Sequence, residues 1–295
     1  MNLSDDIKKK LAALNRRPLD DAKTSDVSQE QNDYRRSLQI NGSPSQTPDF
    51  VSLEGTVAGG EVMSQDGCRV FLVEHRLNEM DTSLDGSRYA ALSEKLSSTL
   101  SSFDSGIRSH LKRVGIADPV SPQDIIFLDL ETTGLGTSPL FLIGVMIWEK
   151  SGLIIQQYFA RDYSEERAAV SLFLQLASAR RLLVSFNGKS FDLPYVRNRA
   201  VANGIPYSLD LPHLDLLHAS RRVWKGKLPD CRLQTIEESI CGRKRHGDIP
   251  GNLIPQAYHA FVRTGNAAQM VDVLQHNALD LITLADIMVR IPDCE

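Results

Sequence analysis

The sequence has few cysteines, no long apolar run and no excess of positive charge, and each absence argues against a class of protein. Its four cysteines are widely separated and include no CxxC pair, so neither a disulfide framework nor a zinc knuckle is expected. No apolar stretch approaches the roughly 18 residues of a transmembrane helix. The first residues are charged and lack a signal-peptide core. We therefore expect a cytoplasmic protein with free cysteines and no membrane contact.

The net charge is -4 at pH 7 and the isoelectric point is near 6.0. A general nucleic-acid binder would usually be basic, so this balance argues weakly against one. The argument loses force if several acids are metal ligands, because bound cations would then make the site locally positive.

The 295 residues suffice for one large domain or two smaller ones. Residues 1–48 are polar and predict a disordered tail. Residues 49–120 alternate apolar and polar positions between Gly-rich turns, then take helical spacing, which indicates a small segment of strands and a helix. Residues 121–295 open with three strand-like runs and then alternate strands with helices. This order predicts a mixed α/β sheet domain flanked by helices.

The expected elements of this domain follow from apolar periodicity. A meander of three strands is expected over 125–130, 139–150 and 152–160. A helix over 165–179, a short buried strand over 180–187 and a helix over 193–204 follow. The last helix is expected over 267–289.

The stretch IIFLDLETTG places two acids at the end of a buried-type strand. Asp129 and Glu131 are two residues apart, so they share one face of the strand. Two adjacent carboxylates repel each other and lose hydration, and a divalent cation would reverse both penalties. The alternative is a surface pair that caps the turn at residues 132–134.

The stretch VSFNGKSFDLPYV places Asp192 five residues after Asn187, at the expected start of a helix. A phosphate-loop motif is rejected because it needs glycine at position 183, where the chain has Leu183. Asp192 is either a functional acid or a first-turn acid that favours the helix dipole.

The stretch VLQHNALDLITLADIM predicts a helix whose apolar face includes Leu281. His276 and Asp280 are four residues apart and therefore neighbours beside that face. Asn277 projects toward the core, where a structural hydrogen bond is expected. A surface His–Asp pair is the alternative to a functional role.

Taken together, the three stretches bring four carboxylates and one histidine from three elements. Two-metal phosphodiester hydrolysis needs such hard oxygen ligands. A neighbouring histidine can take the proton of the attacking water. The combination predicts this chemistry more specifically than any one stretch does.

These motifs resemble the ribonuclease H-like DEDD 3′–5′ exonucleases, with DLETTG, NGKSFD and HNALD as their three motifs. The resemblance is closer to the YprB-type branch of ribonuclease H-like predicted exonucleases, in which FLIG, LPHLDLLH, LPDCRLQTIE and GDIPG also recur in this order. It covers about residues 121–291. It implies a ribonuclease H-like exonuclease domain over 121–295.

The resemblance implies two Mg²⁺ or Mn²⁺ ions held by Asp129, Glu131, Asp192 and Asp280, with His276 as general base or water-positioning residue. His276 precedes Asp280 by four residues, which is the spacing of tyrosine-type members with a histidine in its place. The expected partner is nucleic acid, a single-stranded DNA or RNA 3′ end. The same motifs supply the expected substrate-binding residues Thr132, Thr133, Gly134, Asn187, Lys189 and Phe191.

Two basic runs, 221–227 with Trp224 and 243–245, are read as tracks for a phosphate backbone or, more simply, as solvated surface. The stretch PHLDLLH, read as helical, offers His213, Asp215 and His218. Zinc ligation there is disfavoured because positions i and i+5 diverge on a helix. His213 is expected to be structural, and Asp215 to support the site.

The main hypothesis is a two-metal-dependent nuclease that hydrolyses phosphodiester bonds of DNA or RNA, as a 3′–5′ exonuclease. The first alternative is a non-catalytic nucleic-acid-binding or protein-binding module on the ribonuclease H-like fold. A scaffold that uses residues 1–120 to hold a protein partner is the second.

Overall fold

A computed structural model describes residues 50–77, 86–102, 106–134, 136–149 and 152–292. Phe50–His246 and Asn252–Glu295 form one compact unit, and Gly247–Gly251 fall outside it. The tail predicted over 1–48 lies outside the described residues. No helix in the described part of the chain is long and apolar enough to cross a membrane.

Seven strands of this unit form a single mixed sheet in the order β1-β2-β5-β4-β3-β6-β7. In this order, the four neighbouring pairs β1–β2, β2–β5, β5–β4 and β4–β3 are antiparallel. The pairs β3–β6 and β6–β7 are parallel. The strands are β1 (Gly60–Met63), β2 (Arg69–Arg76), β3 (Ile125–Thr132), β4 (Leu140–Glu149), β5 (Gly152–Phe159), β6 (Leu182–Ser185) and β7 (His213–Asp215). The meander predicted from the apolar runs is confirmed as β3, β4 and β5.

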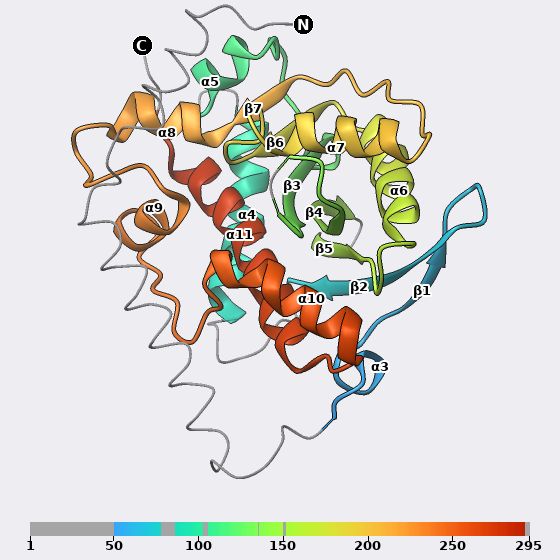
Figure 1. Cartoon of the computed structure of the whole chain (residues 1–295). Helices are drawn as coiled ribbons and strands as arrows, with labels where there is room; N and C mark the ends of the chain where they lie inside the picture. The colour runs from blue at the N-terminus through green and yellow to red at the C-terminus, as the bar shows by residue number, and fades with distance from the viewer. Residues whose placement is uncertain (1–49, 78–85, 103–105, 135, 150–151, 293–295) are drawn as a thin grey trace, which may run out of the picture. The chain divides into compact units, whose positions relative to one another are not determined.

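Helices cover both faces of the sheet (Figure 1). The α-helices are α3 (Leu53–Thr56), α4 (Gly86–Ser101), α5 (Arg108–Arg113), α6 (Glu166–Ser178), α7 (Asp192–Ala202), α8 (Leu216–Trp224), α9 (Leu233–Ser239), α10 (Ile254–Thr264) and α11 (Ala268–Arg290). Two short 3-10 helices are η1 (Pro122–Asp124) and η2 (Gly251–Leu253).

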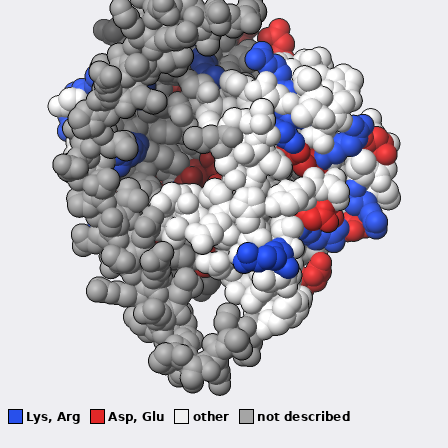
Figure 2. All heavy atoms as spheres, viewed as in Figure 1, with Lys and Arg blue, Asp and Glu red and all other residues white. Residues whose placement is uncertain are grey.

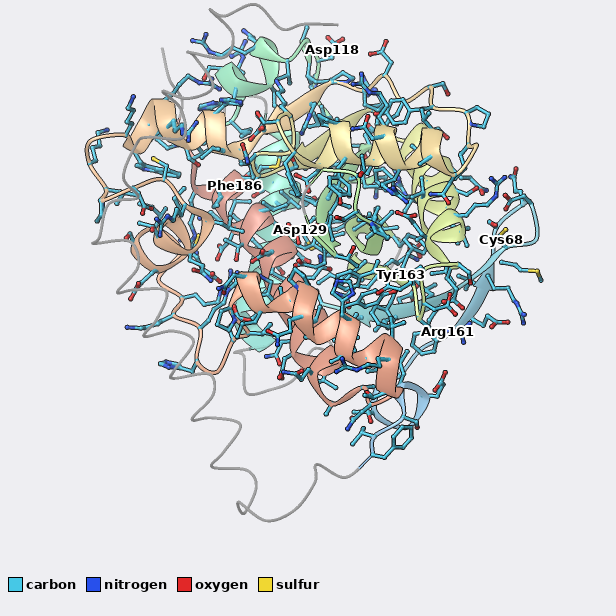
Figure 3. All side chains as sticks on the ribbon, viewed as in Figure 1. Cys68, Asp118, Asp129, Arg161, Tyr163 and Phe186 are labelled. Carbon is cyan, nitrogen blue, oxygen red and sulfur yellow. The ribbon has the colours of Figure 1, made fainter. Side chains whose placement is uncertain are left out.

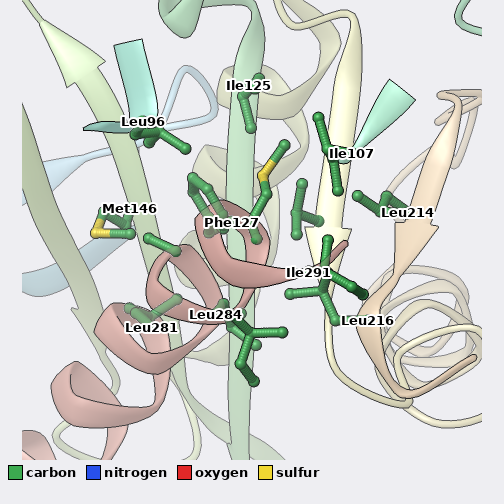
Figure 4. Packing of buried hydrophobic residues seen from close by; sticks show 14 of the residues in the cluster. Leu96, Ile107, Ile125, Phe127, Met146, Leu214, Leu216, Leu281, Leu284 and Ile291 are labelled. Atoms are coloured by element: carbon green, nitrogen blue, oxygen red, sulfur yellow. The ribbon is translucent and has the colours of Figure 1, made fainter. Parts of the chain in front are cut away.

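Alternation along β3 divides the core into two clusters. Ile125 and Phe127 point to the face where α4, α8 and α11 pack, as Figure 4 shows around Phe127 and Leu284. Ile126 and Leu128 point to the opposite face, where α6 and α7 pack. Because side chains alternate along a strand, every odd-numbered position of β3 faces α11.

The strand-rich segment ahead of residue 120 joins the same sheet. β2 pairs antiparallel with β5, and β1 pairs antiparallel with β2. The segment therefore extends the sheet by two strands at the edge beyond β5. The domain boundaries predicted at residues 48 and 120 stay predictions.

The helical interpretation of PHLDLLH is wrong for its first part. His213–Asp215 form β7, which pairs in parallel with β6. Asp215 then caps α8 by accepting a hydrogen bond from the Leu217 N–H at 3.0 Å. A three-residue strand is too short to show periodicity, so the apolar spacing of α8 masks it in the sequence.

Candidate active site

Asp129 and Glu131 lie at the end of β3 on the face that α11 covers. Side chains at odd-numbered positions of β3 share one face of the sheet. Ile125 and Phe127 pack in the core on this face, and Asp129 and Glu131 therefore point to the same side, toward α11. Both side chains are partly buried. Figure 3 shows Asp129 beside α11.

A row of residues across the sheet fixes Asp129 against α11. The register places Asp129 opposite Gly144, and Gly144 opposite Gln157. Asn277, fully buried on α11, donates from Nδ2 to Oδ2 of Asp129 at 2.8 Å, and its Oδ1 accepts from Nε2 of Gln157 at 2.8 Å. A Cβ at Gly144 would lie 2.0 Å from Oδ1 of Asn277. Glycine is therefore required for this contact between helix and sheet.

Asp192 is held by the loop between β6 and α7. Asn187 has φ 65°, the left-handed conformation, which asparagine tolerates better than most residues. A Cβ at Gly188 would lie 2.1 Å from Oγ of Ser185 and 3.0 Å from Oδ2 of Asp192. This tight turn leads directly into α7, whose first residue is the buried Asp192.

Asp215 shapes the same loop from β7. Its buried carboxylate accepts the Asn187 N–H at 2.8 Å and the Lys189 N–H at 3.1 Å. Backbone bonds to a carboxylate are charge-assisted and therefore strong. Asp215 thus supports the site as expected, through the backbone of the loop that carries Asp192.

His213 has a structural partner. Its Nε2 lies 2.7 Å from Oγ of the buried Ser185, which joins β7 to β6. Burial lowers the pKa of His213 to about 4, so the ring is neutral at pH 7. This geometry agrees with the structural role expected for His213.

The predicted His–Asp pair forms on α11. Nε2 of His276 lies 3.6 Å from Oδ2 of Asp280. The other oxygen of Asp280, Oδ1, accepts a hydrogen bond from Nη2 of Arg245 at 2.5 Å. His276 is buried, and the Asp280 side chain is 15% exposed. Asp280 therefore has two charged or titratable partners.

The four candidate acids influence one another electrostatically. Burial raises the pKa of Asp129 well above its ordinary value, and the carboxylates of Asp280, Glu131 and Asp192 raise it further, against a lowering by the Asn277 hydrogen bond. Burial also raises the pKa of Asp192 to about 7, with Asp215 and Asp280 adding to the rise. Acids from β3, α7 and α11 therefore face a common region, in which uncompensated negative charge accumulates.

The chemistry of this donor set fits a hard divalent cation, because carboxylate oxygens are the ligands that Mg²⁺ and Mn²⁺ prefer. Within the described residues, however, no three His, Cys, Asp or Glu side chains lie close enough together to hold one metal ion. The four acids are neighbours without forming a closed coordination shell.

Both threonine hydroxyl groups of the turn after β3 donate hydrogen bonds to backbone carbonyls within that turn. Oγ1 of Thr132 donates to the Gly134 carbonyl at 2.8 Å, and Oγ1 of Thr133 donates to the Pro139 carbonyl at 3.0 Å. The Tyr195 hydroxyl on α7 also donates to the Gly134 carbonyl, at 3.1 Å. These bonds fix the turn beside Glu131, and the expected substrate contacts of this turn stay predictions.

The second group of expected substrate-binding residues lies in the loop before α7. The side chains of Asn187 and Lys189 are exposed, and Phe191 is partly buried against Tyr195 at a ring-centroid distance of 5.4 Å. Lys189 has its backbone fixed by Asp215 and its side chain in solvent, which suits a contact with a phosphate.

The two basic runs differ in the structure. In the first, Arg221, Arg222, Lys225 and Lys227 are exposed while Trp224 is buried, so its ring packs in the core and offers no face to a base. In the second run, only Lys244 is well exposed. Both predictions for Arg243 and Arg245, phosphate track or solvated surface, are wrong, because these side chains are buried in ion pairs with Glu237 of α9. Nothing in LQTIEES marks Glu237 as buried, so the sequence offered no signal for this pairing.

The first prediction tests the close contact between Asn277 of α11 and Gly144 of β4. Gly144→Ala should destabilise the protein by about 1–3 kcal/mol, because the added methyl group overlaps Asn277 and forces a shift of the helix or of the side chain. Urea unfolding measures the change. Gly60→Ala is the matched control, since a Cβ at Gly60 of β1 meets no atom within 4 Å. Equal stability of the two variants would contradict the close contact.

The second prediction concerns pH. A carboxyl group whose folded pKa is raised keeps its proton in the folded state at pH values where the unfolded chain has released it. Stability in metal-free buffer should therefore fall as pH rises from about 4 through about 7, the window set by Asp192 and extended by Asp129. Urea unfolding at several pH values measures this slope. Asp192→Asn should flatten it, whereas Asp118→Asn, at an exposed acid, should leave it unchanged. An unaltered slope in Asp192→Asn would refute the assignment.

Comparison with known proteins gives the family. The chain is 31% identical over 188 residues to the protein YprB of Bacillus subtilis (strain 168), an alignment that covers 62% of this chain and 45% of YprB. The chain therefore matches less than half the length of that relative. The family B DNA polymerase of the hyperthermophilic archaeon Pyrobaculum calidifontis is similar in structure, with a TM-score of 0.45 and 17% identity over 55% of this chain and 24% of the polymerase.

The family model of the RNase_H superfamily matches residues 126–291, from the second residue of β3 to the residue after α11. The predicted α/β ribonuclease H-like fold and the YprB-type resemblance are confirmed. Members of this superfamily are usually nucleases, and such nucleases generally use divalent metal ions. The matched segment contains all five candidate residues, and this chain belongs to the RNase H superfamily.

Proposed function

We propose that this protein is a metal-dependent nuclease that hydrolyses phosphodiester bonds of DNA or RNA and removes nucleotides from the 3′ end of a single strand. The observation that supports this most is the cluster of acids from β3, α7 and α11, inside an RNase H superfamily domain, in which burial and neighbouring carboxylates raise the pKa of Asp129 and Asp192. A binding module has no use for such a cluster, because like charges at close range cost stability.

Asp129, Glu131, Asp192 and Asp280 are the proposed ligands of two Mg²⁺ or Mn²⁺ ions. When bound, two such ions activate a water and neutralise charge that develops on the phosphate. The protein contributes the fixed carboxylates, of which Asp129 is oriented by Asn277 and Asp192 by its loop.

His276 is the proposed acceptor of the proton from the attacking water. It is buried on α11, with its Nε2 3.6 Å from Oδ2 of Asp280. An imidazole near a carboxylate suits a base that must both take and release a proton near neutral pH.

Lys189 is proposed to contact the phosphate backbone, with Thr132, Thr133, Gly134, Asn187 and Phe191 completing the substrate-binding residues. Its exposed ammonium group lies in the loop that leads to Asp192. On the described part of the face in Figure 2, basic and acidic side chains are interspersed. A surface of mixed charge suits contacts with a few phosphates near the 3′ end of a nucleic acid more than contacts along a long stretch of its backbone.

The third prediction is metal-dependent cleavage. The purified chain with Mn²⁺ or Mg²⁺ should shorten a 5′-labelled single strand of DNA or RNA, followed on a denaturing gel. Asp129→Asn should lower the rate at least about 100-fold, because a ligand is lost. Asp118→Asn, at an exposed acid that Figure 3 labels apart from Asp129, is the control and should retain full activity.

Three substrates resolve the polarity and the reaction. A strand blocked at its 3′ end should resist, a strand blocked at its 5′ end should be degraded, and a circular strand should stay intact. Cleavage of the circular strand would show that the protein is an endonuclease and would contradict the proposed exonuclease activity. Binding without turnover in either metal would support the non-catalytic module instead.

The fourth prediction isolates His276. His276→Gln should reduce the cleavage rate by about 10²–10⁴-fold, the usual contribution of a general base, while Mn²⁺ binding stays near that of the unaltered protein. Single-turnover cleavage and Mn²⁺ titration measure the two properties. His259→Gln, an exposed histidine of α10, should change neither. Loss of Mn²⁺ binding in His276→Gln would move the residue from proton transfer to a structural role.

A further inference from the structure

One arginine side chain bridges the candidate site and a buried glutamate outside it. Nε of Arg245 donates to Oε2 of Glu237 at 2.7 Å, and Nη2 donates to Oδ1 of Asp280 at 2.5 Å. The side chains of Arg245 and Glu237 are 7% and 1% exposed. The guanidinium group is therefore a buried positive charge placed directly on one of the proposed metal ligands.

Glu237 is well suited to anchor this arginine. It also accepts a hydrogen bond from Oγ1 of Thr283 at 3.0 Å and lies 2.6 Å from Nε of Arg243. Thr283 is one turn beyond Asp280 on α11, and Glu237 is on α9. The network therefore joins α9 to α11 and holds Arg245 at a fixed place beside Asp280.

The guanidinium of Arg245 and a divalent cation would compete for the carboxylate of Asp280. Arg245 occupies Oδ1, and the Coulomb attraction that it supplies is the same attraction that a metal ion would supply. A metal ion that bound this oxygen would have to displace Nη2 of Arg245. Otherwise the two positive charges would lie close together and repel each other.

We propose that Arg245 is an internal competitor of the divalent ion at Asp280. It neutralises the acid cluster in the metal-free protein and leaves Asp280 when an ion binds. The hydrogen bond to Glu237 would keep the arginine side chain near the site after Nη2 leaves Asp280.

This inference rests on the proposed function, and Mn²⁺ binding separates the two. The free Mn²⁺ signal in electron paramagnetic resonance gives the dissociation constant without any cleavage assay. Arg245→Gln should bind Mn²⁺ about 10-fold more tightly than the unaltered protein, equivalent to about 1.4 kcal/mol. Its metal-free form should unfold at a lower temperature, and Mn²⁺ should raise that temperature by more than in the unaltered protein.

The controls make the outcomes distinct. Arg263→Gln, at an exposed arginine of α10, should bind Mn²⁺ as the unaltered protein does. Asp129→Asn should weaken binding. If the unaltered protein binds no Mn²⁺ and Arg245→Gln binds none, the proposed function fails together with the inference. If Asp129→Asn weakens binding but Arg245→Gln binds no more tightly than the unaltered protein, only the competitor role is overturned.

A second variant covers the loss of folding in Arg245→Gln. Arg245→Lys keeps a positive charge near Glu237 but replaces the planar fork by a single ammonium group, which cannot bridge two carboxylates in the same way. It should bind Mn²⁺ more tightly than the unaltered protein, by a smaller factor than Arg245→Gln. Equal or weaker binding in this variant overturns the competitor role.

Discussion

The absence of a side chain at Gly144 is the constraint on which the candidate site depends. It lets the Asn277 amide lie directly on the sheet, where it meets both Gln157 and Asp129. The contact fixes the height and rotation of α11 above β3, β4 and β5. His276 and Asp280 are on the same helix, so their distance from Asp129 follows from one glycine in the middle of a buried strand.

The site concentrates negative charge at the margin of an apolar core. Burial and mutual repulsion raise the pKa of Asp129 and Asp192, so these acids are a cost that the core on both sides of the sheet has to offset. The polar contacts around them are specific: an amide on Asp129, backbone N–H groups around Asp215 and a guanidinium on Asp280. These contacts hold the carboxyl groups in place against their mutual repulsion.

Periodicity alone gives much of this arrangement. The two-residue spacing places Asp129 and Glu131 on one face, and the four-residue spacing makes His276 and Asp280 neighbours, because both repeats extend over long elements. The strand β7 is too short to show a repeat, and its pairing with β6 arises only in the sheet. Arg243 and Arg245 look like surface residues because their partner, Glu237, is on another helix. Pairings of this kind depend on tertiary packing, which no local pattern encodes.

Asp215 serves two purposes that cannot be adjusted separately. Its carboxylate folds the loop of Asn187 and Lys189, and the same charge contributes to the raised pKa of Asp192. An amide at this position would relieve the repulsion but would give weaker acceptors for the two backbone N–H groups. The loop's shape is thus tied to the electrostatic potential at Asp192. A substitution at Asp215 therefore changes the hydrogen bonds of the loop and the pKa of Asp192 together.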